Sequence, residues 1–476
     1  MSSTSPLADA ANSSIEPGSF RDRTGRIFYH NQRVLRALSP EGALAWRTLK
    51  ATSFYKTWSE NGSLVETHEV QEKNSVPFPG TWECTLEHHR IPFISYPYEW
   101  CFGMLKDAAL LQLEILKAAL AEDVILKDAT PYNLQWQGAQ PIFIDLLSFE
   151  PLASGQVWVG YRQFCELFLY PLMLQAYRDV PFQSFLRGEL EGFSPENFWK
   201  MLSFRDTFRP GVFKHVFLHS KLQQSFSHTS TNIKESLSRA GFRKELILAN
   251  VKGLIRLVRG ICLNRKQTQW SNYAETCPSY SKEDFDAKVR IIEDILSTTK
   301  VSLAWDIGCN TGFFSRLAAK HADYVVGMDS DYLAVERLYQ ALKTEGTKNI
   351  LPLVSNVAQP SPALGWRGLE RKRLEERGKP DLIMALALIH HVVIGANIPL
   401  YEFIEQLALQ GKSLIIEFVT RDDEMVKTLL RNKVDQYSDY SLEHFERCLG
   451  QFFEIKRREP LPSGKRVLYY AVCKKT

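Results

Sequence analysis

The sequence predicts an α/β fold for the C-terminal part of the chain, preceded by a mixed α+β region and a helical connecting region. Three observations carry this prediction. Strand-length apolar runs alternate with helix-like segments from about residue 285 onward, a glycine turn joins the first run to the first helix, and the last two runs form a hairpin. Such alternation is typical of a parallel sheet with crossover helices.

Length and composition limit the class of protein. A chain of 476 residues is too long for one core and suits two or three domains. We expect a disordered tail at 1–16, an α+β region at 17–180, a helical connecting region at 181–284 and the α/β domain at 285–476. Hydrophobic residues make up 45% and the net charge is only +4, so a globular protein is indicated and nucleic acid is not an expected partner.

Targeting and redox signals point to a cytoplasmic protein. The first residues lack the basic and apolar regions of a signal peptide, and no apolar run reaches the roughly 18 residues of a membrane span. The eight cysteines are scattered, without a C-x-x-C motif. This spacing disfavours a zinc site or a disulfide framework and fits a reducing compartment.

Two helix-like stretches precede the α/β domain. MLKDAALLQLEILKAAL, residues 104–120, predicts one long helix. Residues 242–266 carry seven basic residues and one acidic residue, with apolar residues at helical spacing. That pattern suits peripheral contact with an anionic membrane surface, and it equally suits a connecting helix with a solvated face.

The α/β domain is justified element by element. Expected parallel strands are 301–306, 324–329, 349–356, 381–388 and 413–419, separated by helices at 312–320, 331–344, 399–410 and 423–431. A short helix at 441–450 and two strands at 452–459 and 466–474 follow. The residues PLPSG between those two strands predict a hairpin turn.

The turn after the first strand lies in WDIGCNTGFFS, residues 305–315. A phosphate loop needs Lys followed by Ser or Thr at the helix start, where this chain has GFFS. A dinucleotide site needs G-x-G-x-x-G, whereas Gly308 and Gly312 are four residues apart and follow Asp306. An acidic strand end would repel a pyrophosphate but suits the ammonium of S-adenosylmethionine (SAM). The SAM carboxylate would then lie near the start of the next helix.

Two further polar residues end neighbouring strands. Asp329 lies 23 residues after Asp306, where a carboxylate can accept both ribose hydroxyls. Asn356 ends the third strand, where it can meet the adenine amino group. Taken singly, each of these features is also explained by a tight turn or a solvated strand end, but together they favour a SAM site.

Residues 285–476 resemble class I SAM-dependent methyltransferases through DIGCNTG, GMDSD, DLIMALALIHH and the final hairpin. The resemblance implies a Rossmann-like seven-stranded sheet. It places cofactor-binding roles on six residues: Asp306, Gly308, Asn310, Gly312, Asp329 and Asn356. The lead-in at 270–288 also resembles the family's pre-sheet segment, in which Tyr280 is a further candidate for cofactor contact.

The acceptor side is expected after the fourth strand, because ligands lie outside the carboxyl ends of parallel strands. His390 and His391 follow that strand and are candidates for a base or a substrate-orienting group. Either histidine is alternatively a packed residue. Glu417, at the end of the fifth strand, is a second candidate, and the charged connection at 360–380 suits a binding loop or a surface helix.

A second motif lies in ILKDATPYNLQWQGAQPIFIDLLSFE, residues 125–150. In kinases an Asp accepts the proton of the substrate hydroxyl, and an Asn and a second Asp bind magnesium. The stretch resembles aminoglycoside- and choline-kinase-like phosphotransferases and places these roles on Asp128, Asn133 and Asp145. However, no glycine-rich loop is visible, and the expected strand lysine is missing, with only Arg33 and Arg36 nearby. Binding of magnesium and ATP is therefore one alternative, and a kinase-like fold kept for other binding is favoured.

The order of these parts resembles a bacterial group of methyltransferases related to a host-specificity nodulation protein, through GSFRDRTGRIF, SYPYEW, LKDATPYN and LALIHHVVIG. The resemblance implies a small-molecule, saccharide or lipid-linked acceptor. We therefore expect a SAM-dependent methyltransferase that carries out O-methylation. A bifunctional kinase–methyltransferase and a catalytically silent scaffold are the alternative hypotheses.

Overall fold

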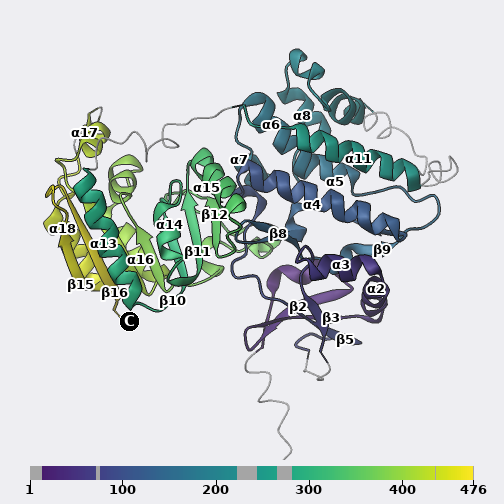
Figure 1. Cartoon of the computed structure of the whole chain (residues 1–476), viewed down its shortest axis with the longest axis horizontal. Coiled ribbons are helices and arrows are strands. Elements are labelled where there is room, and N and C mark those ends of the chain that lie inside the picture. Colours follow the sequence, from purple (N-terminus) through teal and green to yellow (C-terminus); the bar gives the residue numbers. More distant parts are fainter. Residues whose placement is uncertain are drawn as a thin grey trace, which may run out of the picture. The chain divides into compact units, whose positions relative to one another are not determined.

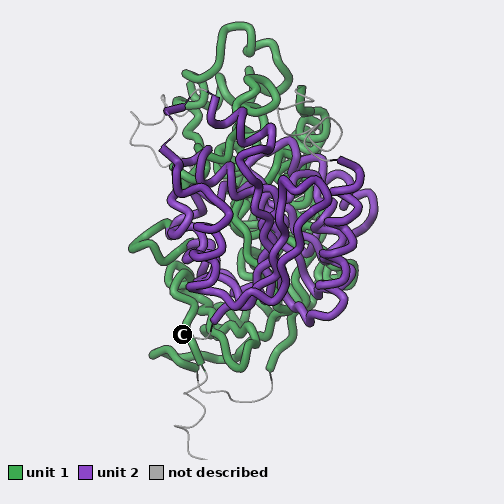
Figure 2. Tube along the Cα trace, turned by 90° about the vertical axis from the view of Figure 1, so that its left-hand side faces the viewer, with its two compact units in different colours: residues 1–136, 141–265, 364–371 green, residues 137–140, 266–363, 372–476 purple. Residues whose placement is uncertain are grey.

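The computed structural model describes residues 13–70, 76–221, 244–264, 281–431, 433–434 and 436–474. The chain forms two compact units (Figure 2). Unit 1 comprises residues 1–136, 141–265 and 364–371, and unit 2 comprises 137–140, 266–363 and 372–476. Each unit is built around its own sheet.

Unit 1 begins with a five-stranded sheet in the order β1-β2-β3-β5-β4, in which every neighbouring pair is antiparallel. The strands are β1 (Ser13–Ile15), β2 (Gly25–His30), β3 (Arg33–Leu38), β4 (Thr67–Glu69) and β5 (Cys84–His88). Helices α2 (Pro40–Lys50) and α3 (Ser53–Glu60) follow β3, and the side chains of Ser39 and Thr52 cap them. The expected disordered tail is wrong for Ser13–Ile15, because these residues pair with β2; residues 1–12 lie outside the described residues.

The rest of unit 1 is largely helical (Figure 1). The predicted long helix is α4 (Phe102–Ala121). After it come two strand pairs, β6 (Val124–Leu126) antiparallel with β9 (Phe149–Pro151), and β7 (Leu134–Gln137) with β8 (Gln140–Phe143). Further helices are α5 (Tyr161–Phe164), α6 (Tyr170–Arg178), α7 (Gln183–Gly188), α8 (Pro195–Met201) and α11 (Lys244–Gly260).

Helix α11 contains the described part of the basic stretch at 242–266. It packs against α4, and its apolar residues Ile247, Val251, Leu254, Ile255 and Val258 are buried. Arg259 also forms an ion pair with Glu114 of α4, at 2.8 Å. The apolar face of α11 is therefore part of the core of unit 1.

Unit 2 contains a seven-stranded sheet in the order β12-β11-β10-β13-β14-β16-β15. Its strands are β10 (Val301–Ile307), β11 (Ala322–Asp329), β12 (Ile350–Val354), β13 (Leu382–Ala385), β14 (Ser413–Val419), β15 (Phe453–Pro460) and β16 (Arg466–Cys473). The first five are parallel, and β16 runs antiparallel between β14 and β15. The predicted seven-stranded sheet with an antiparallel edge hairpin is confirmed.

The helices of unit 2 are α13 (Lys282–Thr298), α14 (Phe313–Ala318), α15 (Tyr332–Glu345), α16 (Leu400–Gln410), α17 (Glu424–Leu430) and α18 (Leu442–Phe452) (Figure 1). The strand order reverses after β12, so right-handed crossovers place α14 and α15 on one face of the sheet and α16 on the other. Such a reversal opens a crevice at the carboxyl ends of the central strands.

The connection between β12 and β13 contains no α-helix. Two short 3-10 turns, Trp366–Gly368 and Leu374–Glu376, interrupt an otherwise irregular path. The alternative prediction of a surface helix at 360–380 is therefore wrong. Among the described residues, no helix has the length and apolar character needed to cross a bilayer.

Candidate functional site

The glycine turn after β10 depends on left-handed backbone. Gly308 and Gly312 both have φ of +80°, and Asn310 between them has φ of +50°. A Cβ at position 312 would lie 2.4 Å from Leu338 Cδ1 of α15, so that position has no room for a side chain. Position 308 therefore requires glycine because of its left-handed backbone. Position 312 requires glycine both for its left-handed backbone and because Leu338 packs against it.

A cavity of about 340 Å³ lies at this turn, at the carboxyl ends of the parallel strands. Its walls come from the turn after β10, the end of β11, the loop after β12 and the segment after β13. Five of the predicted site residues line it: Gly308, Asn310, Asp329, Asn356 and His391. The size is within the range of small-molecule sites, roughly 300–1,000 Å³.

Asp329 links two walls of this cavity. One carboxylate oxygen accepts the Asn310 N–H at 2.8 Å, and the other accepts the Asp331 N–H at 2.9 Å. Burial raises the pKa of Asp329 above its usual value, while these two N–H groups favour the ionised form. The carboxylate therefore holds the glycine turn and still faces the cavity.

Asp306 and Gly312 do not line the cavity. Asp306 is only 2% exposed, and its carboxylate accepts the Ser315 hydroxyl at 2.6 Å. Burial raises the pKa of Asp306 to about 6, with a further contribution from the charge of Asp329. Its direct role is to connect the end of β10 to α14, a helix of only six residues.

The two histidines differ in their surroundings. His391 lines the cavity and begins a π-helical turn that runs to Gly395, and burial lowers its pKa to about 4. His390 is fully buried, and neither of its ring nitrogens has a hydrogen-bond partner within the described residues. The two ring centroids are 4.1 Å apart. Of the two candidates, only His391 faces the cavity.

Glu417 lies in a buried ion-pair network. It is fully buried, and its carboxylate accepts from Lys288 at 2.6 Å and from Arg466 at 3.1 Å. It also accepts the backbone N–H of Ala387 at 2.9 Å. Ala387 lines the cavity and has φ of +52°, so Glu417 fixes the turn after β13.

Sequence reasoning missed Lys288, Arg466 and Ala387 as parts of the site. A signal for Arg466 was present, since this residue begins an apolar strand run, and a buried charged residue is usually paired. No comparable signal marks the left-handed Ala387. Tyr280 lies outside the described residues.

A second cavity of about 300 Å³ lies next to the first and shares Ile307, Ser355 and Val357 with it. Its other walls come mainly from α16 and from Pro360, Leu374 and Glu375. The lining is largely apolar, with Glu402, Gln406 and Gln410 of α16 as polar groups. The irregular connection between β12 and β13 therefore borders this second space.

The predicted kinase-like residues of unit 1 come together. Asp128 accepts from Asn133 Nδ2 at 3.0 Å and from the hydroxyl of Ser148. Burial, and next the charge of Asp145, raise the pKa of Asp128 above its usual value. Arg36 of β3 is 6% exposed and bridges Asp145, at 2.8 Å, and Asp22. All three predicted groups are thus engaged by neighbouring side chains.

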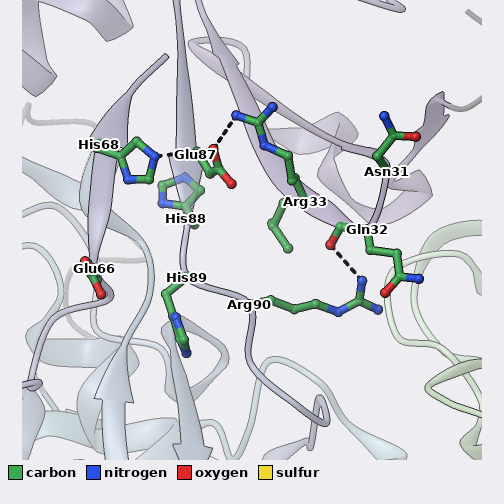
Figure 3. Close-up of a pocket in the computed structure, with 10 residues that line it drawn as sticks. Asn31, Gln32, Arg33, Glu66, His68, Glu87, His88, His89 and Arg90 are labelled. Atoms are coloured by element: carbon green, nitrogen blue, oxygen red, sulfur yellow. Dashed lines mark hydrogen bonds and ion pairs between the residues drawn. The ribbon is translucent and has the colours of Figure 1, made fainter. Parts of the chain in front are cut away.

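Unit 1 also contains a polar cavity of about 320 Å³ beside the β2–β3 turn and the end of β5 (Figure 3). Glu87 accepts from Arg33 and pairs with His68 at 3.3 Å, and Arg90 donates to the backbone oxygen of Gln32 at 2.8 Å. Its charges are therefore largely paired with one another. In the part of the chain that the structure describes, no group of three or more His, Cys, Asp or Glu residues is arranged to hold a metal ion.

No family model matches the sequence. The chain is 34% identical over 455 residues to the nodulation protein NoeA of Rhizobium meliloti (strain 1021), which covers 95% of this chain and 94% of that protein. The chain belongs to the NoeA family. Sequence similarity to a nodulation protein thus extends over almost the whole length of both chains.

Partial structural likenesses are found among methyltransferases. The N-methyltransferase NodS of Bradyrhizobium japonicum WM9 covers 41% of this chain and 99% of its own, with 14% identity and a TM-score of 0.31. The magnesium protoporphyrin IX methyltransferase ChlM of Synechocystis PCC 6803, solved with bound SAM, covers 44% of this chain and 87% of its own, with 18% identity and a TM-score of 0.28.

Proposed function

We propose that this member of the NoeA family is a SAM-dependent methyltransferase. The observation that carries the proposal is Asp329, a carboxylate at the end of β11 that faces the cavity and is bonded to the glycine turn. This is the group that a ribose needs, on a seven-stranded sheet of the kind that the class I methyltransferase resemblance implies. The wide spacing of the eight cysteines supports a cytoplasmic location.

The residues around the cavity fit SAM as cofactor. Asp329 would accept the ribose hydroxyls, Asn356 would meet the adenine amino group, and the backbone at Gly308 and Asn310 would border the amino acid part. A Cβ at Gly308 would lie 3.3 Å from Leu388 Cδ1, another cavity residue, and would narrow this space. When bound, SAM supplies an activated methyl group, so the protein needs chiefly to align the acceptor.

We infer that the reaction is O-methylation of a saccharide or another small molecule. His391 supports this inference because it faces the cavity and its low pKa keeps the imidazole neutral at pH 7. A neutral imidazole accepts a proton from a hydroxyl as the oxygen attacks the methyl group. Its position after β13 is fixed indirectly by Glu417, which holds the preceding turn at Ala387.

Calorimetric titration with SAM tests the cofactor site. We expect micromolar binding that Asp329→Ala weakens by about a hundredfold, since two charged hydrogen bonds contribute roughly 3 kcal/mol. Asp323→Ala is the matched control, because Asp323 is an exposed carboxylate near the other end of the same strand. Absence of SAM binding in the folded wild-type protein would refute the proposal. Equal loss in both variants would refute the role of Asp329.

We further propose that unit 1 has a kinase-like fold. Its support is the sheet order β1-β2-β3-β5-β4 with helices between β3 and β4, followed by a long helix and the pairs β6–β9 and β7–β8. The gathering of Asp128, Asn133 and Asp145 after this helix supports the same view. Arg36 lies on β3, the strand that carries the phosphate-binding lysine in kinases.

We infer that this fold serves binding, not phosphoryl transfer. Magnesium would need Asp145, which Arg36 neutralises, and the acidic Asp22 occupies the other side of the same guanidinium. Incubation with ATP and magnesium should therefore release no ADP above the rate seen in Asp128→Ala. ADP release that Asp128→Ala abolishes would instead establish the bifunctional kinase–methyltransferase.

A further inference from the structure

Four large apolar side chains are exposed within a short segment of unit 1. Phe204 and Phe208 are 80% and 79% exposed, Phe213 is 52% exposed and Leu218 is 40% exposed. Single exposed apolar residues are common, but contiguous ones mark an interaction surface. We call Phe204, Arg205, Phe208, Arg209, Phe213 and Lys214 the aromatic–basic patch.

The aromatic residues of the patch belong to two adjoining turns that contact each other, the 3-10 turn Phe204–Phe208 and the π-helical turn Phe213–Phe217. Phe204 and Phe208 meet edge to face with ring centroids 5.7 Å apart. Phe213 stacks on Phe217 at 5.5 Å, and Phe217 contacts Trp199 at 5.1 Å. The exposed rings therefore belong to two aromatic groups on adjoining turns, Phe204 with Phe208, and Phe213 with Phe217 and Trp199.

The first turn is held rigidly by Asp206, which is only 2% exposed. Its carboxylate accepts the Ser203 N–H at 2.8 Å and the Ser203 hydroxyl at 2.7 Å. It also pairs with Arg178 at 3.2 Å and with Arg209 at 3.1 Å. Because this anchor fixes both ends of the turn, the outward direction of Phe204 and Phe208 is built into the fold.

The charge around these rings is positive. Residues 199–221 contain five basic residues and one acidic residue, the buried Asp206. Arg205 and Lys214 are exposed and form no ion pair within the described residues. The surface thus presents aromatic rings among cations, without an exposed carboxylate from its own segment.

We propose that the aromatic–basic patch docks the protein on an anionic lipid surface. Phenylalanine rings can enter the interfacial region of a bilayer, while arginine and lysine bind the anionic headgroups. The charge of the patch favours lipid as the occupant, since Arg205 and Lys214 lie among the rings and form no ion pair within the described residues. Helix α11 offers less apolar surface, because five of its apolar residues are buried in the core of unit 1.

Co-sedimentation of the full-length protein with vesicles tests this proposal. We expect binding to phosphatidylcholine vesicles that contain one-third phosphatidylglycerol, and at least about tenfold weaker binding to pure phosphatidylcholine. Raising sodium chloride from about 50 to about 500 mM should weaken binding, because salt screens the headgroup attraction. The double variant F204S/F208S and the charge variant R205E/K214E should each lower vesicle binding at least about tenfold.

The matched control is L44S/L409S, which also replaces two exposed apolar residues, each 66% exposed, outside the patch. It should bind vesicles as the wild type does. Circular dichroism and thermal unfolding of every variant verify that both units remain folded. Failure of the wild type to bind anionic vesicles, or unchanged binding by F204S/F208S, would overturn the proposal. Concentration-dependent self-association in sedimentation velocity that F204S/F208S abolishes, without vesicle binding, would assign the patch to contact between copies.

Discussion

The two units hold their predicted site residues in opposite ways. In unit 2, Asp329, Asn356 and His391 lie around a cavity. Hydrogen bonds from backbone N–H groups to the carboxylates of Asp329 and Glu417 hold the turns that border it. In unit 1, Asp128 is bonded to Asn133 and Ser148, and Asp145 is bonded to Arg36. The polar cavity in Figure 3 follows the second pattern, since Glu87 is shared by Arg33 and His68.

This difference separates residues that are arranged for a ligand from residues that satisfy one another. A buried polar group has a low energy only when it is paired, so a pair formed within the protein must be broken before a ligand can bind. In the unit 2 cavity no internal pair has to be broken, because Asp329 lines the cavity and would keep its two backbone partners when a ligand binds. A sequence motif specifies residue types, whereas their contacts in the folded protein determine whether these residues can bind a ligand.

The largest expected effect is at His391, the histidine that faces the open cavity. His391→Ala should lower methyl transfer about 10²–10⁴-fold, because it removes the proton acceptor, while SAM affinity stays within about twofold. Transfer of labelled methyl groups from SAM into a polar cell extract measures the rate. With the wild type, transfer should rise as the pH rises through about 4, the pKa of His391, and be flat near neutrality.

His321→Ala is the matched control, since His321 follows α14 in the same unit and does not line the cavity. It should transfer methyl groups at the wild-type rate. Unchanged transfer by His391→Ala would remove this histidine from the mechanism. A loss of SAM affinity as large as the loss of rate would show that His391 supports the cavity and does not act on the acceptor.

A second effect concerns the turn that keeps the unit 2 site open. Gly312→Ala should lower the free energy of unfolding by about 3 kcal/mol, because left-handed backbone costs roughly 1–2 kcal/mol and overpacking roughly 1–3 kcal/mol. Gly346→Ala is the control, since φ there is +69° but its Cβ would meet no atom within 4 Å. It should cost only about 1 kcal/mol. Urea unfolding compares the two, and equal losses would show that Leu338 makes room.

Much of the fold of unit 2 was predictable because each parallel strand is a largely apolar run. The strand predicted at 413–419 is β14, and the helix predicted at 399–410 is α16 to within one residue. Local pattern sufficed for these elements, since burial on both faces of a parallel sheet leaves a clear signal. The connection at 360–380 was ambiguous because it combines charged residues with only short apolar spacing.

The site was predictable only in part. Its glycines and strand-end carboxylates follow local rules, whereas the Lys288–Glu417 pair joins residues 129 positions apart and cannot be read from spacing. The same limit applies to Arg36, whose partner Asp145 lies 109 positions away. Sequence reasoning therefore found five residues that line the cavity but not the long-range contacts that hold the surrounding turns.

The smallest expected effect tests whether the charge of Asp306, which does not line the cavity, contributes to the affinity for SAM. SAM carries a net positive charge, and the ionised form of Asp306 attracts it. With a pKa of about 6, Asp306 loses its charge as the pH falls, so SAM affinity should drop by about tenfold between pH 7 and pH 5. Asp306→Asn keeps an acceptor for Ser315 and should flatten this dependence, as measured by calorimetry at both pH values.

Asp128→Asn is the parallel change in unit 1, where burial also raises the carboxyl pKa but internal partners engage the group. It should leave the pH dependence of SAM affinity as in the wild type. The raised pKa of Asp306 has a separate consequence for the ligand-free protein. The folded state keeps a proton that the unfolded chain releases near 3.8, so the free energy of unfolding should fall as the pH rises from about 4 to 6. If Asp306→Asn flattens this stability profile but leaves the pH dependence of SAM affinity unchanged, Asp306 serves the turn alone, and Asp329 is the acidic group that the cofactor meets.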